Sequence, residues 1–266
     1  MRVITKITRQ KNNAERYNIF LDGEYAFPVD EAVLIKFELT KDKVLTNEEI
    51  GEINYEDEIR KAFNRALHFL SFRMRSEHEV KEKLKDDFGE AVILEAIVKL
   101  KDYGFLNDEA FATAFMNTKK NAAKQGPRAI AQDLKRKGVS DQTREAVLDE
   151  FGYAEQVEIA TQLAQKVARS ERSKTPAQVK QKIRDNLMRK GYSFEVIADA
   201  IAATPITRDE EDWDTMIEKQ GDKIWDKYAR KATGYELKMK VKQALYQKGF
   251  PSDIIDTFIE QKESAL

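Results

Sequence analysis

The chain has 266 residues, a formal net charge of −1 and charged side chains at 35% of its positions, against roughly 25% in an average domain. It has no cysteine, which excludes disulfides, thiolate catalysis and cysteine-ligated metals and suits the reducing cytoplasm. No apolar stretch is long enough to cross a membrane, and the first twenty residues lack the apolar run of a signal peptide, so we expect no membrane partner and no leader.

The first thirty residues predict a small antiparallel sheet. Apolar residues alternate on both sides of Asp22-Gly23, and such a pair between alternating runs is a strong signal for a type I′ hairpin turn. Val3, Ile4 and Ile7 could supply a third strand, and Pro28 is expected to end the sheet. We assign residues 1–45 to this hairpin region together with a short helix.

From about residue 30 onward the sequence is typical of helices. A Ser or Thr followed three residues later by Glu or Gln forms a capping box, in which each side chain satisfies a free backbone amide at a helix start. Gly126-Pro127 imitates such a start, because glycine is an acceptable cap and proline suits the first helical position. The boxes predict helices that begin after Thr46, Ser76, Thr175 and Thr233.

The starts at 76, 126, 175 and 233 share one pattern and are spaced 50, 49 and 58 residues apart. Apolar residues follow each start at offsets of four and eight, and a glycine then ends the helix. That ending is a repeated phrase: LKRKG at 134–138, LMRKG at 187–191 and LYQKG at 245–249, with Gly89 in the same role in the first copy. Glycine is expected there because the residue after a helix often adopts a left-handed conformation.

The pattern predicts a mainly α fold of tandem three-helix repeats, stacked into an elongated array, straight or curved, behind the small N-terminal β-hairpin region. A single unit of this size cannot bury its apolar face alone, so neighbouring units must stack. The expected repeats span residues 46–107, 108–152, 153–207 and 208–266.

Few residues carry a signature of catalysis. The glycines form neither standard phosphate-binding loop. The only histidines are His68 and His78, and the His78-Glu79 pair lacks the second histidine of a zinc peptidase helix. The acidic run at 209–212 is interpreted as a solvated helix start, where carboxylates favour the exposed amides, rather than a metal site. We therefore expect no catalytic residue, no metal and no cofactor.

Two aromatic patterns are interpreted as core. Phe111 and Phe115 form an i, i+4 pair, and a second stripe at helical spacing comprises Trp213, Ile217, Ile224 and Tyr228.

Charge is distributed unevenly along the chain. Residues 116–191 contain 17 basic and 9 acidic side chains, whereas residues 192–222 contain 2 basic and 9 acidic ones. Stacked repeats would bring equivalent cations onto one stripe that fits phosphates or an acidic protein groove; the alternative is ordinary Lys and Arg lying along helix surfaces. The predicted basic stripe comprises Arg73, Arg75, Lys119, Lys120, Lys124, Arg128, Lys135, Arg136, Lys137, Lys180, Lys182, Arg184, Arg189 and Lys190.

Three segments, LHFLSFRMRSEHEVKEKL, LKDYGFLNDEAFATAF and KQGPRAIAQDLKRKGV, resemble the RecX family of regulators of the RecA recombinase. The resemblance lies in an Arg-x-x-Ser-x-x-Glu-like start, a Gly-aromatic-Leu-Asn/Asp-Asp step and a Leu-x-x-Lys-Gly ending. Residues 73–79, 104–108 and 134–138 carry these motifs. The likeness is good over 62–139 and weaker to the C-terminus, and the length and hairpin resemble the longer members from Gram-positive bacteria.

The resemblance implies a helical modulator of DNA recombination and repair that docks along the groove of the RecA–DNA filament and usually inhibits the recombinase. It also implies no cofactor, no small-molecule substrate and no catalysed reaction. Two other functions stay open: direct binding of single- or double-stranded DNA, and a general protein-interaction scaffold.

Overall fold

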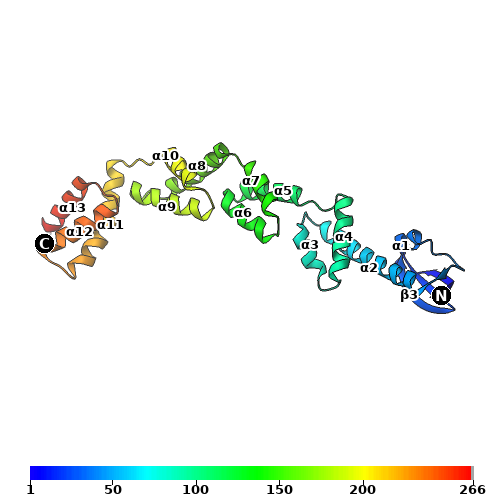
Figure 1. Cartoon of the computed structure of the whole chain (residues 1–266). Coiled ribbons are helices and arrows are strands. Elements are labelled where there is room, and N and C mark those ends of the chain that lie inside the picture. Colours follow the sequence, from blue (N-terminus) through cyan, green and yellow to red (C-terminus); the bar gives the residue numbers. More distant parts are fainter. Residues whose placement is uncertain (265–266) are drawn as a thin grey trace. The chain divides into compact units, whose positions relative to one another are not determined.

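The computed structural model describes residues 1–264. It is mainly helical, with a small sheet near the N-terminus, as the sequence predicts (Figure 1). The chain divides into two compact units: unit 1 is Met1–Phe115 with Leu134–Arg144, and unit 2 is Met116–Asp133 with Glu145–Leu266. The division passes through α5 (Asp108–Ala122), α6 (Pro127–Arg136) and α7 (Asp141–Asp149).

The sheet is antiparallel, in the order β3-β2-β1-β4. It comprises β1 (Arg2–Arg9), β2 (Arg16–Leu21), β3 (Glu24–Asp30) and β4 (Val44–Leu45). Asp22 and Gly23 both have positive φ, 54° and 93°, as a type I′ turn requires. The expectation that Pro28 ends the sheet is wrong: β3 continues to Asp30, because an edge strand tolerates a residue without an N–H.

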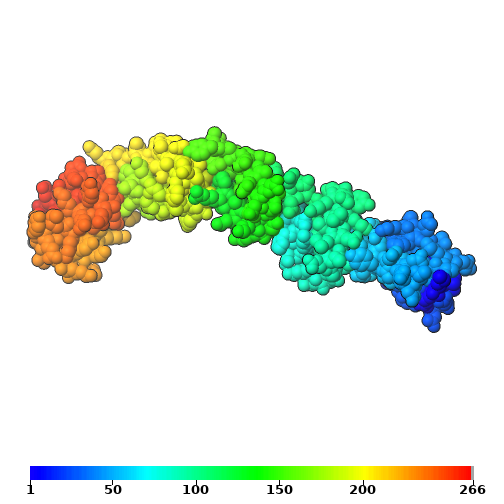
Figure 2. Space-filling model, viewed as in Figure 1, coloured from blue at the N-terminus to red at the C-terminus, as the bar shows by residue number. Residues whose placement is uncertain are grey.

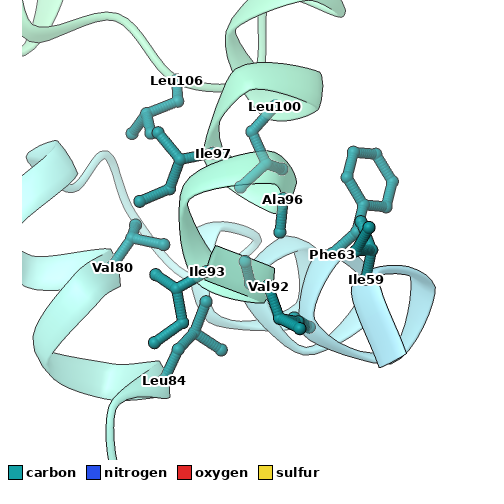
Figure 3. Packing of buried hydrophobic residues seen from close by; sticks show 12 residues of the cluster. Ile59, Phe63, Val80, Leu84, Val92, Ile93, Ala96, Ile97, Leu100 and Leu106 are labelled. Carbon is teal, nitrogen blue, oxygen red and sulfur yellow. The ribbon is translucent and has the colours of Figure 1, made fainter. Parts of the chain in front are cut away.

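A single long helix, α2 (Asn47–Leu70), takes part in two cores of unit 1. Ile53 packs with the sheet and α1 (Glu31–Lys36), and the buried Asp57 carboxylate accepts hydrogen bonds of 2.8 Å from the Arg16 guanidinium and from the Asp30 amide. Further along the same helix, Ile59 and Phe63 enter the core of the first repeat with α3 (Glu77–Leu84) and α4 (Glu90–Asp102) (Figure 3).

Unit 2 contains two further three-helix groups. The helices α8 (Tyr153–Ser170), α9 (Pro176–Arg189) and α10 (Phe194–Ala202) pack on one another, as do α11 (Glu210–Ala229), α12 (Gly234–Gln247) and α13 (Ser252–Ser264), which close into one cluster (orange to red in Figure 2). The predicted stripe on α11 lies in that second core, with Ile217 and Ile224 buried and Trp213 and Tyr228 partly buried. Phe111 of the other predicted pair is also buried.

The predicted capping boxes at Thr46, Ser76 and Thr175 are all present. Two expectations about helix ends are wrong. Thr233 makes no side-chain cap, because Gly234 turns into the left-handed region at φ 56°, and Glu236 pairs with Lys240 instead. Gly89 does not end α3 but caps the start of α4 in an extended conformation.

Each repeated Lys-Gly phrase contacts the start of the middle helix in the preceding repeat. At the first joint, the Ser76 hydroxyl donates to the Lys137 carbonyl at 2.6 Å. At the second joint, the Gly126 amide donates to the Lys190 carbonyl at 2.7 Å. At the third joint, the Thr175 hydroxyl donates to the carbonyl of Lys248. The phrase is therefore both a helix end and the contact between neighbouring repeats.

Glycine is required in each phrase for two reasons, its backbone conformation and its close approach to the neighbouring repeat. Gly138, Gly191 and Gly249 have φ of 75°, 88° and 85°, the left-handed conformation expected for a helix end. A Cβ at Gly191 would also lie 2.3 Å from the backbone nitrogen of Ala129, and one at Gly138 would lie 2.3 Å from the Cβ of His78. The two backbones thus approach too closely for any side chain.

That all repeats form a single elongated array stays a prediction.

Replacing Gly191 by alanine tests this double requirement. The matched control is Gly104→Ala, because Gly104 also has positive φ, 75°, but a Cβ there meets nothing within 4 Å. The free energy of unfolding of the control should fall by about 1 kcal/mol because of backbone strain. That of Gly191→Ala should fall by about 3 kcal/mol, because overpacking adds roughly 1–3 kcal/mol to the strain. Urea denaturation measures both losses. Equal losses would show that close approach at the joint does not matter.

Candidate interaction surface

The basic residues of α6 and α9 lie on the outer faces of these helices because apolar residues at helical spacing occupy the inner faces. Ile130 and Leu134 are fully buried on α6, as are Val179 and Ile183 on α9. The intervening positions are left to solvent. Those that carry an exposed cation are Arg128, Lys135, Arg136, Lys180, Lys182, Arg184 and Arg189.

Several cations of the predicted stripe are neutralised by carboxylates. Arg73 and Lys137 both contact Glu79, each at 2.8 Å. The remaining pairs are Lys119 with Asp133 at 3.4 Å, Lys120 with Glu155 at 2.9 Å, and Lys182 with Glu171. These side chains therefore take part in ion pairs within the chain.

Other cations of the stripe have no ion pair within the described part of the chain. Arg75 lies over the ring of Phe69, with 4.1 Å between guanidinium carbon and ring centroid. The Arg184 guanidinium donates to the Gln181 side chain at 2.7 Å. The full set comprises Arg75, Lys124, Arg128, Lys135, Lys180, Arg184, Arg189 and Lys190.

Three of these cations, Arg128, Arg189 and Lys190, lie at the second joint, within unit 2. A groove of about 210 Å³ there is lined by Arg128, Ala129 and Gln132 of α6 and by Met188, Arg189, Gly191, Tyr192 and Phe194 around the turn between α9 and α10. We call this the second-joint groove. The Lys190 ammonium donates to the Ala123 carbonyl at 2.7 Å, and the Tyr192 hydroxyl donates to the Lys124 carbonyl at 3.2 Å. These bonds hold the segment before α6 against the turn.

The groove combines positive charge with apolar surface. Met188 and Phe194 are exposed beside the two arginines, and Tyr192 is buried beneath them. Burial raises the pKa of the Tyr192 phenol well above its usual value, so the hydroxyl stays a neutral donor. One acid lies nearby: the backbone amide of Glu195, the Ser193 hydroxyl and the charge of Arg128 together lower the pKa of the Glu195 carboxyl.

Sequence reasoning missed Gln132, Met188 and Phe194 in this groove. The comparison of repeats offered one signal. Met188 occupies the position held by Lys135 in the preceding phrase and Tyr246 in the next, and all three side chains are exposed. Met188 is therefore a surface residue and not part of the core, and together with Phe194 it gives the groove its exposed apolar side chains.

The acidic run at 209–212, the other candidate site of the sequence, has a structural role. The Asp209 carboxylate accepts a 2.8 Å hydrogen bond from the Asp212 amide and so caps α11, as the interpretation of the acidic run predicts. Among residues 1–264, no group of three or more potential ligands could hold a metal ion. Within the same range, every helix is too short or too polar to span a membrane.

Comparison with known proteins places these features in one family. The model of the regulatory protein RecX N-terminal domain matches residues 2–46. The model of the first RecX three-helix domain matches residues 62–100, and that of the second matches residues 107–148. The model of the third three-helix domain matches two segments, residues 154–201 and 210–259. The chain belongs to the RecX family of regulatory proteins.

RecX proteins of similar length are found in several bacteria. The chain is 43% identical over 263 residues to regulatory protein RecX of Bacillus licheniformis and 42% identical over 264 residues to that of Bacillus subtilis, covering 98% and 99% of this chain and all of each relative. A crystal structure of a regulatory protein RecX matches with a TM-score of 0.66 at 37% identity, over 74% of this chain and 98% of that one. A RecX crystal structure from Lactobacillus salivarius matches with a TM-score of 0.54 at 34% identity, over 55% of this chain and 96% of that one.

The matches also clarify the repeat. One RecX model, that of the third three-helix domain, matches both α8–α10 and α11–α13. The two groups are therefore copies of the same domain type, which the recurrence of LMRKG as LYQKG already predicts.

The first joint should show a measurable pH dependence through Glu79. Burial raises the pKa of its carboxyl, but hydrogen bonds from Arg73, Lys137 and the Ser76 amide outweigh this and hold the pKa at about 2. Because the pKa of Glu79 is lower in the folded state than its unfolded value of 4.5, the ionised carboxylate stabilises the fold at pH values above 4.5. This stabilisation is lost as the pH falls from 4.5 toward 2. Glu79→Gln should therefore cost roughly 1–2 kcal/mol at neutral pH, because solvent screens part of the shift.

Urea denaturation between pH 7 and pH 2.5 measures the difference in free energy of unfolding between Glu79→Gln and the unmodified protein. This difference should become smaller as the pH falls. Glu82→Gln is the control, since Glu82 is exposed and pairs with Lys85 on the same turn; it should have little effect. A constant gap between Glu79→Gln and the unmodified protein would contradict the assignment of the effect to ionisation.

Proposed function

We propose that this RecX-family chain inhibits the RecA recombinase in the cytoplasm by docking along the groove of the RecA–DNA filament through the basic face of its helices. The second-joint groove is the observation that carries the proposal. There, Arg128 and Arg189 are exposed beside exposed apolar side chains, and neither forms an ion pair within residues 1–264. Cations of this kind suit an acidic protein surface or a phosphate backbone, and both chemistries meet in a protein–DNA filament.

The repeat architecture suits a polymeric target. A filament presents the same subunit surface at regular intervals, and a chain of similar helical groups can contact several subunits. Each contact raises the effective concentration for the next, so individually weak contacts give strong binding. Occupation of the groove would block strand exchange or bias filament assembly. We assign no catalytic step, cofactor or small-molecule substrate to this function.

Direct binding of nucleic acid is a second candidate, favoured by Phe194. Its exposed ring lies in the same groove as Arg128 and Arg189, and single-stranded nucleic acids bind to surfaces where aromatic rings accompany cations. This function predicts that the isolated chain binds DNA tightly, with an affinity that falls steeply as salt is added.

Reversing four exposed cations to glutamate tests the electrostatic part of the proposal. The variant carries Lys135→Glu, Arg136→Glu, Arg184→Glu and Arg189→Glu. The DNA-dependent ATPase activity of purified RecA, measured with each protein across a salt series, should be inhibited at least tenfold less by the variant than by the unmodified chain. The difference should shrink as salt rises, because screening weakens the original contacts.

A control variant makes the same change in net charge elsewhere. It reverses four exposed cations of α11 and its C-terminal turn: Lys219, Lys223, Arg230 and Lys231. This control should inhibit RecA as the unmodified chain does. Full inhibition by the folded first variant would refute the electrostatic contact, and binding of bare DNA without any effect on RecA would support the second candidate.

A further inference from the structure

The loop between α2 and α3, residues 71–75, presents two large apolar side chains to solvent. Phe72 is 72% exposed and Met74 is 49% exposed. The exposed His68 ring lies edge-on to Phe72, with 5.1 Å between centroids, and so supports one side of the phenyl ring. We call Phe72 and Met74 the apolar knob. It lies wholly within unit 1.

The loop that carries the knob is held in shape by its polar neighbours. The Arg73 guanidinium donates to the Met74 carbonyl and to the Glu79 carboxylate, each at 2.8 Å. The Ser71 hydroxyl donates to the His68 carbonyl at 2.8 Å, and Arg75 lies over Phe69 on the core side. A loop braced in this way loses little conformational freedom on binding, which favours affinity.

The repeat architecture does not require apolar residues here. The loops that precede the caps in the other repeats read AAKQ at 122–125, ERSK at 171–174 and RKA at 230–232, with no aromatic residue and no methionine. These sequences lead into Gly126, Thr175 and Thr233 just as residues 71–75 lead into Ser76. The first repeat therefore departs from the others at a position where large apolar side chains meet water, which is typical of a binding surface.

The chemistry of the loop favours a protein over a nucleic acid. A phosphate would have to compete for the two arginines of the loop, because the Arg73 guanidinium binds Glu79 and the loop backbone and Arg75 is stacked on Phe69 with its Nε buried. Buried Phe and Met side chains are common anchors of protein interfaces. The surroundings stay net positive, because Arg73 and Lys137 share the one carboxylate of Glu79.

We propose that the apolar knob inserts into an apolar pocket with an acidic rim on a RecA subunit of the filament. This inference rests on the proposed function and adds to it a second kind of contact. The knob buries apolar surface, so its contribution depends little on ionic strength, whereas the contribution of the basic face falls with added salt. The two contacts can therefore be measured separately.

The double variant Phe72→Ser with Met74→Ser tests the knob. Its affinity for RecA filaments on single-stranded DNA, measured by biolayer interferometry, should fall at least tenfold, while the slope of log affinity against log salt stays that of the unmodified chain. Phe72→Leu with Met74→Leu keeps the apolar surface and should retain binding within about threefold. Thermal unfolding followed by circular dichroism should be the same for all three proteins, because the knob lies outside the core.

The matched control is Tyr235→Ser with Met239→Ser on α12, since these residues are 77% and 48% exposed. It should bind as the unmodified chain does, and an equal loss in this control would overturn the assignment to the knob. Unchanged binding by the serine variant at the knob would refute the inference and leave the proposed function standing. Failure of the unmodified chain to bind or inhibit RecA would overturn both.

Discussion

The hydrogen bond from the start of one helix to a lysine carbonyl in the next repeat is the contact on which the rest of this structure depends. It occurs at Lys137, Lys190 and Lys248, each followed by a left-handed glycine that lets the two backbones meet. A hydroxyl supplies the proton at the first and third joints and a backbone amide at the second. Burying either donor without a partner would lower the stability of the folded chain by about 1–3 kcal/mol. Each joint therefore fixes how the preceding repeat packs against its neighbour.

The joints also decide which cations remain available to a partner. Three residues after the cap, the first joint has Glu79, the second Ala129 and the third Gln178. Glu79 draws Arg73 and Lys137 into an internal cluster, and Gln178 donates to the neutral Gln220. With alanine in this place, the second joint has no carboxylate that corresponds to Glu79, and among residues 1–264 neither Arg128 nor Arg189 forms an ion pair, although Glu195 lies near Arg128. The first joint thus has two of its cations paired with Glu79, although Arg75 and Lys135 beside it form no ion pair within the described residues.

Much of the fold could be predicted because helix caps and glycines act locally. Ser76 with Glu79, Thr175 with Gln178, and the glycines of the repeated phrase follow from residues at most a few positions apart. The errors at Pro28 and Gly89 came from context: an edge strand tolerates proline, and a glycine can begin the next helix as well as end the last. The candidate surface was less predictable, because the partner of Lys137 lies 58 residues away in the sequence. Exposed apolar residues such as Phe72 carry no periodic signal and appear only when the repeats are compared.

The N-terminal sheet and the first repeat are connected by a helix rather than by a flexible linker. Both cores count residues of α2 among their own, with Ile53 in one and Ile59 in the other, and Asp57 between them ties the helix to β2 and β3. Melting either core would free one half of α2 and weaken the other, because helix formation is cooperative. The sheet and the first repeat should consequently gain and lose structure together.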